Sequence, residues 1–181
     1  DISRLVQVSL AGERCDPDTI WWLRKHLPNT CINDNWWQTE TGWPVASNYL
    51  NQKVFGPLFP TLPGSTSKPN PGWNLYLLNE KGEEVPRGQL GNLAAKLPMP
   101  PSAMSTLWCN DEKFVEKYLT EFPGYYSFGD EGVVDERGYL SIMSRTDDVI
   151  NVAGHRLDTG RLEEAINKHD DIVESAVIGF N

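Results

Sequence analysis

The chain has 181 residues, 39% of them hydrophobic, and a formal net charge of −9 at pH 7. This length accommodates one domain or one domain plus part of another, and seven tryptophans supply apolar volume for a packed core. The acidic charge excludes the basic footprint of a nucleic-acid-binding protein, and no apolar run approaches the roughly 20 residues of a membrane helix, so we expect neither partner.

The three cysteines, Cys15, Cys31 and Cys109, are odd in number and too widely spaced for the common zinc patterns. This pattern predicts reduced thiols. We therefore expect a cytoplasmic protein or, in a eukaryote, one of the mitochondrial matrix.

The N-terminal part predicts a strand, a loop and a helix. Residues 5–10 alternate between apolar and polar side chains, as a half-buried strand does. Asp16 and Pro17 suit the N-cap and the first position of a helix that ends before Pro28. A strand–loop–helix unit is typical of α/β layers.

The middle of the chain predicts a β-rich subdomain of short strands and tight turns. The expected elements are strands at 73–78 and 91–97 with a turn at Gly82 between them, a helix over 112–122, and a hairpin over 132–143 with Gly138 at its turn.

The C-terminal part predicts the beginning of a second domain. We place the boundary between residues 146 and 147, which gives domains 1–146 and 147–181. Beyond it we expect a strand at 149–152, a helix with Thr159 as its N-cap, and a further strand at 172–179.

The run from Asp34 to Gly42, with the sequence DNWWQTETG, combines two tryptophans with hydroxyl, amide and carboxylate side chains. Paired tryptophans can simply be part of a core. However, a hydroxyl can donate to a phosphate oxygen, and a carboxylate can bind Mg²⁺. An indole can form the wall of a small apolar pocket. The run therefore indicates either core or one wall of a ligand site.

Three further segments have an ordinary interpretation and a functional one. Gly12-Glu13-Arg14 can be a plain loop, and Asp130 can be a solvated loop carboxylate. Arg145 with Asp147 and Asp148 can be a surface ion-pair cluster worth under about 1 kcal/mol.

The loop Gly64-Ser65-Thr66-Ser67 is rich in hydroxyls, as a phosphate-binding loop often is. It lacks the Gly-Lys-Ser/Thr ending of a P-loop and does not open a helix, so we do not interpret it as one.

Together, these segments resemble one family. The run Trp36-Trp37-Gln38-Thr39-Glu40-Thr41-Gly42 resembles the motif of acetyl- and propionyl-CoA synthetases, within the adenylate-forming superfamily. Its continuation Trp43-Pro44-Val45-Ala46 and the run Lys96-Leu97-Pro98-Met99-Pro100-Pro101 look more like the propionyl-CoA synthetase branch. The resemblance covers essentially the whole chain, with the motifs in the family's order.

The resemblance implies an α/β fold with a β-rich subdomain: the C-terminal portion of the large adenylate-forming domain, then the start of a small α+β lid domain. It implies an AMP-forming ligase that activates propionate or acetate with ATP, releases pyrophosphate and passes the acyl group to coenzyme A. Mg²⁺ is the implied metal cofactor.

The resemblance also implies a role for individual residues. Nucleotide binding falls to Gly12, Glu13, Arg14, Asp34, Asn35, Trp36, Gln38, Thr39, Asp130, Arg145 and Arg156. The catalytic contacts are Thr39, Glu40, Arg145 and Arg156, and Glu40 is the Mg²⁺ ligand. Trp37 closes the acyl pocket, Asp147 is the hinge, and Ala153 and Gly154 line the passage for coenzyme A. Arg14, Phe128 and Ser144 depart from the family's usual Pro, Thr and Gly.

Two parts of the family's machinery, an upstream phosphate loop and a lysine late in the lid, are not found in this sequence. We therefore expect an inactive piece of a longer synthetase, with the remainder of the same polypeptide as its partner. Two alternatives are a non-catalytic nucleotide- or sugar-binding module and an adenylate-forming enzyme with another acceptor, such as carrier-protein phosphopantetheine.

Overall fold

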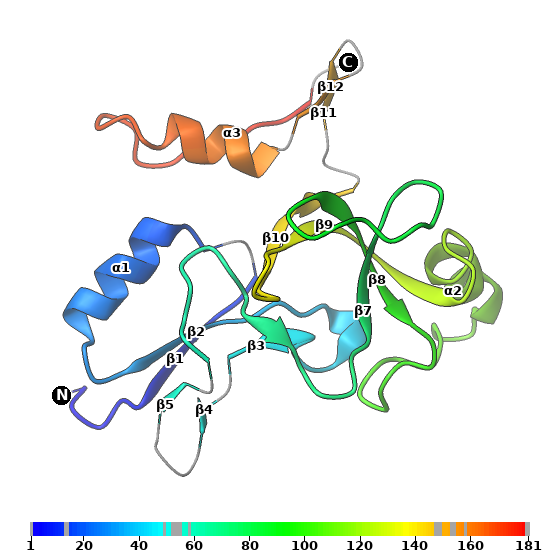
Figure 1. Cartoon of the computed structure of the whole chain (residues 1–181), viewed down its shortest axis with the longest axis horizontal. Helices are drawn as coiled ribbons and strands as arrows, with labels where there is room; N and C mark the ends of the chain where they lie inside the picture. The colour runs from blue at the N-terminus through cyan, green and yellow to red at the C-terminus, as the bar shows by residue number, and fades with distance from the viewer. Residues whose placement is uncertain are drawn as a thin grey trace.

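The computed structural model describes residues 2–12, 15–48, 50–51, 56–57, 59–146, 150–152, 155–157 and 159–179, with only the backbone for 50, 51, 56, 57, 151, 152, 155, 156, 161 and 164. Its elements form a mixed α/β arrangement, as the sequence predicts. In Figure 1 a helix with two strands occupies one side and a larger sheet the other, with the C-terminal elements above both.

The N-terminal unit is a strand–helix–strand crossover. Strands β1 (Gln7–Leu10) and β2 (Cys31–Asp34) pair in parallel, and α1 (Pro17–His26) connects them. The predicted N-cap of α1 is confirmed, because the Asp16 side chain accepts a hydrogen bond from the Thr19 backbone N–H at 2.9 Å. Strand β2 was not predicted from the sequence. All four of its residues are buried, so it lacks the polar–apolar alternation by which a half-buried strand is found.

The larger unit is a four-stranded antiparallel sheet in the order β10-β9-β8-β7. Its strands are β7 (Leu75–Leu78), β8 (Leu90–Lys96), β9 (Tyr125–Val134) and β10 (Leu140–Arg145). The predicted turns at Gly82 and Gly138 are confirmed, and both glycines have positive φ angles, +77° and +83°. Short antiparallel pairs lie in the segment between the two units: β3 (Ala46–Ser47) with β6 (Lys68–Pro69), and β4 (Leu50–Asn51) with β5 (Gly56–Pro57).

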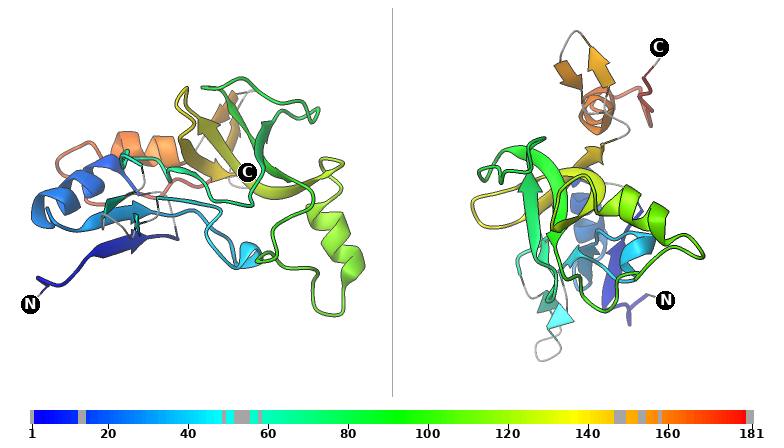
Figure 2. Two further views of the ribbon diagram at one scale, coloured as in Figure 1. Left: turned by 60° about the horizontal axis from the view of Figure 1, so that its bottom comes forward. Right: turned by 90° about the vertical axis from the view of Figure 1, so that its right-hand side faces the viewer.

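Helix α2 (Asp111–Tyr118) packs beside β9 at the far end of this sheet (Figure 2). Asn110 caps it by accepting from the Lys113 backbone N–H at 3.1 Å. The helix ends before the predicted limit, Phe122. Phe122 precedes Pro123, and helical backbone is disfavoured for a residue that precedes a proline. The ring of Phe122 is buried outside the helix.

The C-terminal elements are the hairpin of β11 (Ile150–Val152) with β12 (His155–Leu157), and α3 (Thr159–Ile166), which contacts β10. Thr159 is the first residue of α3 and not its cap. The predicted strand at 172–179 is wrong, because this segment pairs with no strand in the described part of the chain. It is tied to α3 instead: the Val177 backbone N–H donates to Glu163 Oε1 at 2.8 Å.

The main core lies under the four-stranded sheet and is unusually aromatic. Trp36 packs edge-on against Phe128 with ring centroids 4.8 Å apart, and Phe128 in turn contacts Trp73 and Tyr126. Trp36 therefore ties the segment after β2 to strand β9. The remaining buried members are Val45, Ala46, Leu77, Leu93, Ala95, Phe114, Tyr118 and Leu140.

Candidate functional site

A cavity of about 240 Å³ opens where the N-terminal unit meets the four-stranded sheet. Gly12 follows β1 and Asp34 ends β2, so the cavity lies at the carboxyl ends of the parallel pair, where α/β sheets usually bind ligands. The lining residues are Gly12, Asp34, Asn35, Trp36, Trp37, Gln38, Gly64, Thr66, Asp130, Ile142, Met143, Ser144 and Arg145.

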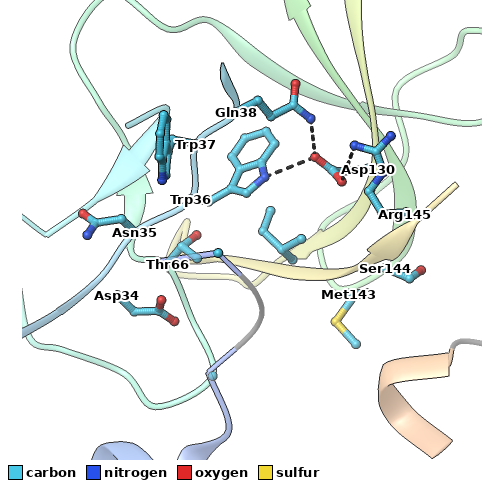
Figure 3. A pocket seen from close by; sticks show the side chains of 13 residues that line it. Asp34, Asn35, Trp36, Trp37, Gln38, Thr66, Asp130, Met143, Ser144 and Arg145 are labelled. Carbon is cyan, nitrogen blue, oxygen red and sulfur yellow. Dashed lines mark hydrogen bonds and ion pairs between the residues drawn. The ribbon is translucent and has the colours of Figure 1, made fainter. Parts of the chain in front are cut away.

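Asp130, on β9, is the best-supported polar group of this cavity. It is 5% exposed, and its Oδ2 accepts from Trp36 Nε1 at 3.2 Å and from Gln38 Nε2 at 2.6 Å. Its Oδ1 lies 3.8 Å from Arg145 Nη1. Figure 3 shows Trp36, Gln38 and Arg145 converging on this carboxylate. A buried carboxylate is costly unless it is paired and hydrogen-bonded, so these groups account for its position.

Backbone geometry brings Arg145 to Asp130. The two residues are partners in the β9–β10 ladder, and Gly129 has a φ of +69°. The Thr146 backbone N–H donates to the Gly129 carbonyl at 2.9 Å. The ladder shifts register between Ile142 and Ser144, and such bulges turn side chains to new directions beside functional sites. Residues 142 to 145 consequently all line the cavity.

The two adjacent tryptophans have different environments. Both line the cavity, but Trp36 is 7% exposed and belongs to the core, whereas Trp37 is 47% exposed. In Figure 3 the Trp37 ring lies away from Asp130, on the side of Asn35. Trp36 is therefore a core residue, which is the ordinary interpretation of the paired tryptophans. Trp37 is exposed enough to form the wall of a pocket.

Asn35 and Asp34 line the cavity on the side away from Asp130 (Figure 3). The Asn35 backbone N–H and side-chain Nδ2 both donate to the Leu10 carbonyl, at 2.9 and 3.2 Å, and this joins the ends of β1 and β2. Burial, with the Asp34 and Asp16 carboxylates, raises the pKa of the nearby Cys15 thiol to about 11.

Thr39 and Glu40 lie in a short 3-10 turn, η1 (Thr39–Thr41), and neither lines this first cavity. Glu40 lines an adjacent one of about 210 Å³, which Gln38 and Arg145 separate from the first. Glu40 Oε1 accepts a hydrogen bond from the Tyr118 hydroxyl at 2.8 Å. Burial and this contact with Glu40 raise the pKa of Tyr118 to about 12. The Thr39 side chain is exposed and lines neither cavity.

The described residues contain no group of three or more His, Cys, Asp or Glu side chains that could hold a metal ion alone. Mg²⁺ usually binds through one or two carboxylates, with the remaining positions taken by substrate phosphates and water. The partly buried Glu40 carboxylate fits that requirement as a single protein ligand.

Five of the predicted site residues, Glu13, Arg14, Asp147, Ala153 and Gly154, lie outside the described residues. Arg156 belongs to β12, but its side chain is likewise not described. Their roles remain predictions from the sequence.

Five lining residues were not predicted as site residues from the sequence: Gly64, Thr66, Ile142, Met143 and Ser144. The 64–67 loop was considered only as a P-loop, which it is not. The backbone N–H of Thr66 and the hydroxyl of Ser65 both donate to the Leu140 carbonyl, at 2.9 and 2.6 Å, and so the loop lies against β10. Its run of hydroxyl residues was the only available signal.

Comparison with known proteins identifies the family. The family model described as "AMP-binding enzyme" matches residues 1–108. The chain belongs to the AMP-binding enzyme family.

Relatives within this family agree with the sequence resemblance. The chain is 42% identical over 178 residues to acyl-CoA synthetase short-chain family member 3, mitochondrial, of Mus musculus, covering 98% of this chain and 26% of that protein. It is 42% identical over 184 residues to propionate–CoA ligase of Escherichia coli (strain K12), covering 99% of this chain and 28% of that protein. The chain thus spans about a quarter of the length of these relatives.

Solved structures show the same fold. An anthranilate CoA ligase, AuaEII, in complex with anthranoyl-AMP matches with a TM-score of 0.78 and 29% identity, over 100% of this chain and 32% of that one. The amide bond synthetase McbA from Marinactinospora thermotolerans matches in fold with a TM-score of 0.80 at 23% identity, over 99% and 34%. In the described part of this AMP-binding family member, no helix is long and apolar enough to cross a membrane.

Proposed function

We propose that the chain is part of a short-chain acyl-CoA synthetase and that its Asp130–Arg145 cavity binds the adenylate. The observation that carries this proposal is a buried carboxylate, already fixed by Trp36 and Gln38, with a guanidinium 3.8 Å away in the same cavity. A carboxylate can accept hydrogen bonds from both ribose hydroxyls, and a guanidinium can bind a phosphate. The two groups that an adenylate needs therefore stand side by side.

The remaining site residues take the following roles in this proposal. Gly12, Glu13, Arg14, Asp34, Asn35, Trp36 and Gln38 surround the base and ribose, and Arg145 and Arg156 neutralise phosphate charge. Trp37 limits the acyl pocket, and Thr39 contacts the α-phosphate. Asp147 acts as the hinge, while Ala153 and Gly154 line the coenzyme A passage.

The reaction proceeds in two displacements. A carboxylate oxygen of propionate or acetate attacks the α-phosphorus of ATP, and pyrophosphate leaves with the electron pair of the broken P–O bond. The thiol of coenzyme A, after loss of its proton, then attacks the acyl carbonyl and AMP leaves. When bound at Glu40, Mg²⁺ neutralises phosphate charge. One methylene in an apolar pocket is worth only about 1–3 kcal/mol, so Trp37 would separate acetate from propionate weakly.

The proposed activity needs the remainder of a longer polypeptide, because the chain spans about a quarter of its relatives. We expect the 181 residues alone to bind adenylate but not to catalyse ATP–pyrophosphate exchange with propionate, and robust exchange would refute this expectation. The proposed compartment is the cytoplasm or, in a eukaryote, the mitochondrial matrix; the relatives include mitochondrial and bacterial proteins.

Calorimetric titration of the 181-residue chain with AMP tests the proposal. Asp130→Asn keeps an acceptor oxygen for Trp36 and Gln38 but removes the charge, so we expect AMP affinity to fall on the order of tenfold or more. Asp135→Asn is the matched control, because Asp135 lies in the exposed β9–β10 turn, where it pairs with Arg137. Equal affinities in both variants, or stronger binding of an oligosaccharide than of AMP, would overturn the adenylate site.

A further inference from the structure

The hydroxyl of Tyr118 makes a long-range contact with the motif that contains Glu40. Tyr118 is the last residue of α2, 78 positions from Glu40, and its hydroxyl donates to Glu40 Oε1 at 2.8 Å. No other hydrogen bond to the Glu40 carboxylate occurs within the described residues. The backbone carbonyl of Glu40 is held separately, by the Met104 backbone N–H at 2.8 Å. Tyr118 thus provides the hydrogen bond that orients this carboxylate.

The ring of Tyr118 is itself held by the sheet. Phe114 and Tyr118 lie four positions apart on one face of α2, and both are buried in the main core. The Tyr118 ring stacks on that of Tyr126 with centroids 5.2 Å apart and an interplanar angle of 5°. Tyr126 belongs to β9, the strand that also carries Asp130. The position of the Tyr118 hydroxyl is therefore fixed by β9, the same strand that carries Asp130, the residue proposed to bind the ribose.

We propose that Tyr118 is a positioning residue that holds the Glu40 carboxylate in the orientation in which it binds the metal of Mg²⁺·ATP. This inference rests on the proposed function. Glu40 projects from a turn of three residues, and an unrestrained glutamate side chain loses considerable rotamer entropy when it is fixed. Mg²⁺ requires nearly ideal octahedral geometry, so a carboxylate that is oriented beforehand binds it better. Groups that hydrogen-bond to metal ligands commonly contribute tenfold or more to metal affinity.

Tyr126 supplies a matched control for Tyr118. The two rings form one stack, but the Tyr126 hydroxyl is buried and has no hydrogen-bond partner among the described residues. Tyr118→Phe and Tyr126→Phe therefore each remove one hydroxyl from the same stack and leave both rings in place. Only the first removes a hydrogen bond to Glu40. Thermal unfolding of both variants shows whether each remains folded.

The first test needs neither metal nor catalysis. NMR relaxation of the ¹³C-labelled Glu40 side chain in the 181-residue chain measures how far the carboxylate arm is restrained. We expect Tyr118→Phe to increase its motion and Tyr126→Phe to leave it as in the unsubstituted chain. Equal motion in all three proteins would overturn the positioning role. This result does not depend on whether Asp130 and Arg145 bind the adenylate.

The second test uses Mn²⁺, a paramagnetic substitute for Mg²⁺, with ATP on the same chain, and water-proton relaxation reports its binding. We expect Tyr118→Phe to weaken Mn²⁺·ATP binding on the order of tenfold, Glu40→Gln to weaken it at least as much, and Tyr126→Phe to have no effect. If Glu40→Gln weakens binding and Tyr118→Phe does not, the positioning role is wrong while the proposed function stands. If Glu40→Gln has no effect, the metal role of Glu40 fails, and with it that part of the proposed function.

Discussion

Asp130 is a buried carboxylate whose two oxygens have different neighbours. Its Oδ2 is occupied by Trp36 and Gln38, while Oδ1 faces Arg145 at 3.8 Å, beyond normal hydrogen-bond distance. The side chain is thus oriented through Oδ2, and both Asp130 and Arg145 line the cavity. A carboxylate that is held in place before a ligand arrives needs little rearrangement, and preorganisation of this kind lowers the cost of binding.

Cys15 gives a second prediction about a single residue, because the pKa of its thiol depends on the charge of Asp34, at the end of the cavity away from Asp130. The pKa of Cys15 is raised to about 11 by burial first and by the Asp34 and Asp16 carboxylates second. Removing the Asp34 charge lowers this pKa and increases the thiolate fraction at pH 9. We therefore expect Asp34→Asn to accelerate alkylation of Cys15 by iodoacetamide, followed by mass spectrometry of its peptide. Asp18→Asn, a change in the first turn of α1, is the control, and equal acceleration in both variants would refute the assignment.

At the scale of elements, η1 depends on its contact with the 102–104 segment. Gly42 ends the turn with a φ of +62°, and a Cβ atom there would overlap the backbone carbonyl oxygen of Ser102. The Glu40 carbonyl accepts from Met104 two residues further on. The glycine of the motif is thus required by backbone geometry, and it lets Glu40 approach α2.

Gly42→Ala should consequently be costly for stability. Gly88 also has a positive φ, +80°, but a Cβ atom there meets no atom within 4 Å. Gly88→Ala therefore measures the backbone strain alone, about 1–2 kcal/mol. We expect Gly42→Ala to reduce the free energy of unfolding by at least about 1 kcal/mol more, because Ser102 must also move. Urea unfolding of the two variants measures the difference, and equal losses would mean that the close approach to Ser102 costs nothing.

At the scale of the whole molecule, the sequence predicts local features well and long-range contacts poorly. Asp16 and Pro17 start α1, and Gly138 turns the hairpin, because caps and turns depend on a few neighbouring residues. The bond from Trp36 to Asp130 joins residues 94 positions apart, and no periodicity predicts such a pair. The strand expected at 172–179 shows the same limit, since strand formation depends on a partner that hydropathy does not specify.

The site could be predicted only as a set of motifs. The family resemblance indicated Asp130, Arg145 and the run from Trp36 to Gly42, and of that run Trp36, Trp37 and Gln38 line one cavity with Asp130 and Arg145. It gave no indication that Glu40 would lie in a neighbouring cavity or that Tyr118 would bind it, because that arrangement depends on how α2 packs against β9. The contribution of Thr66 depends likewise on the pairing of its loop with β10.

The most direct test of the adenylate site is a ¹⁵N-NMR titration of the 181-residue chain with AMP. The indole Nε1–H of Trp36 and the side-chain amide of Gln38 both donate to Asp130, so they report any ligand that reaches this carboxylate. We predict that AMP shifts these two signals together with that of Arg145 Nε. The signals of Val85 and Leu93, which line a second, separate cavity of about 260 Å³, should remain unchanged. Shifts confined to that second cavity, or no shift of the Trp36 indole at saturating AMP, would contradict the proposal that Asp130 and Arg145 bind the adenylate.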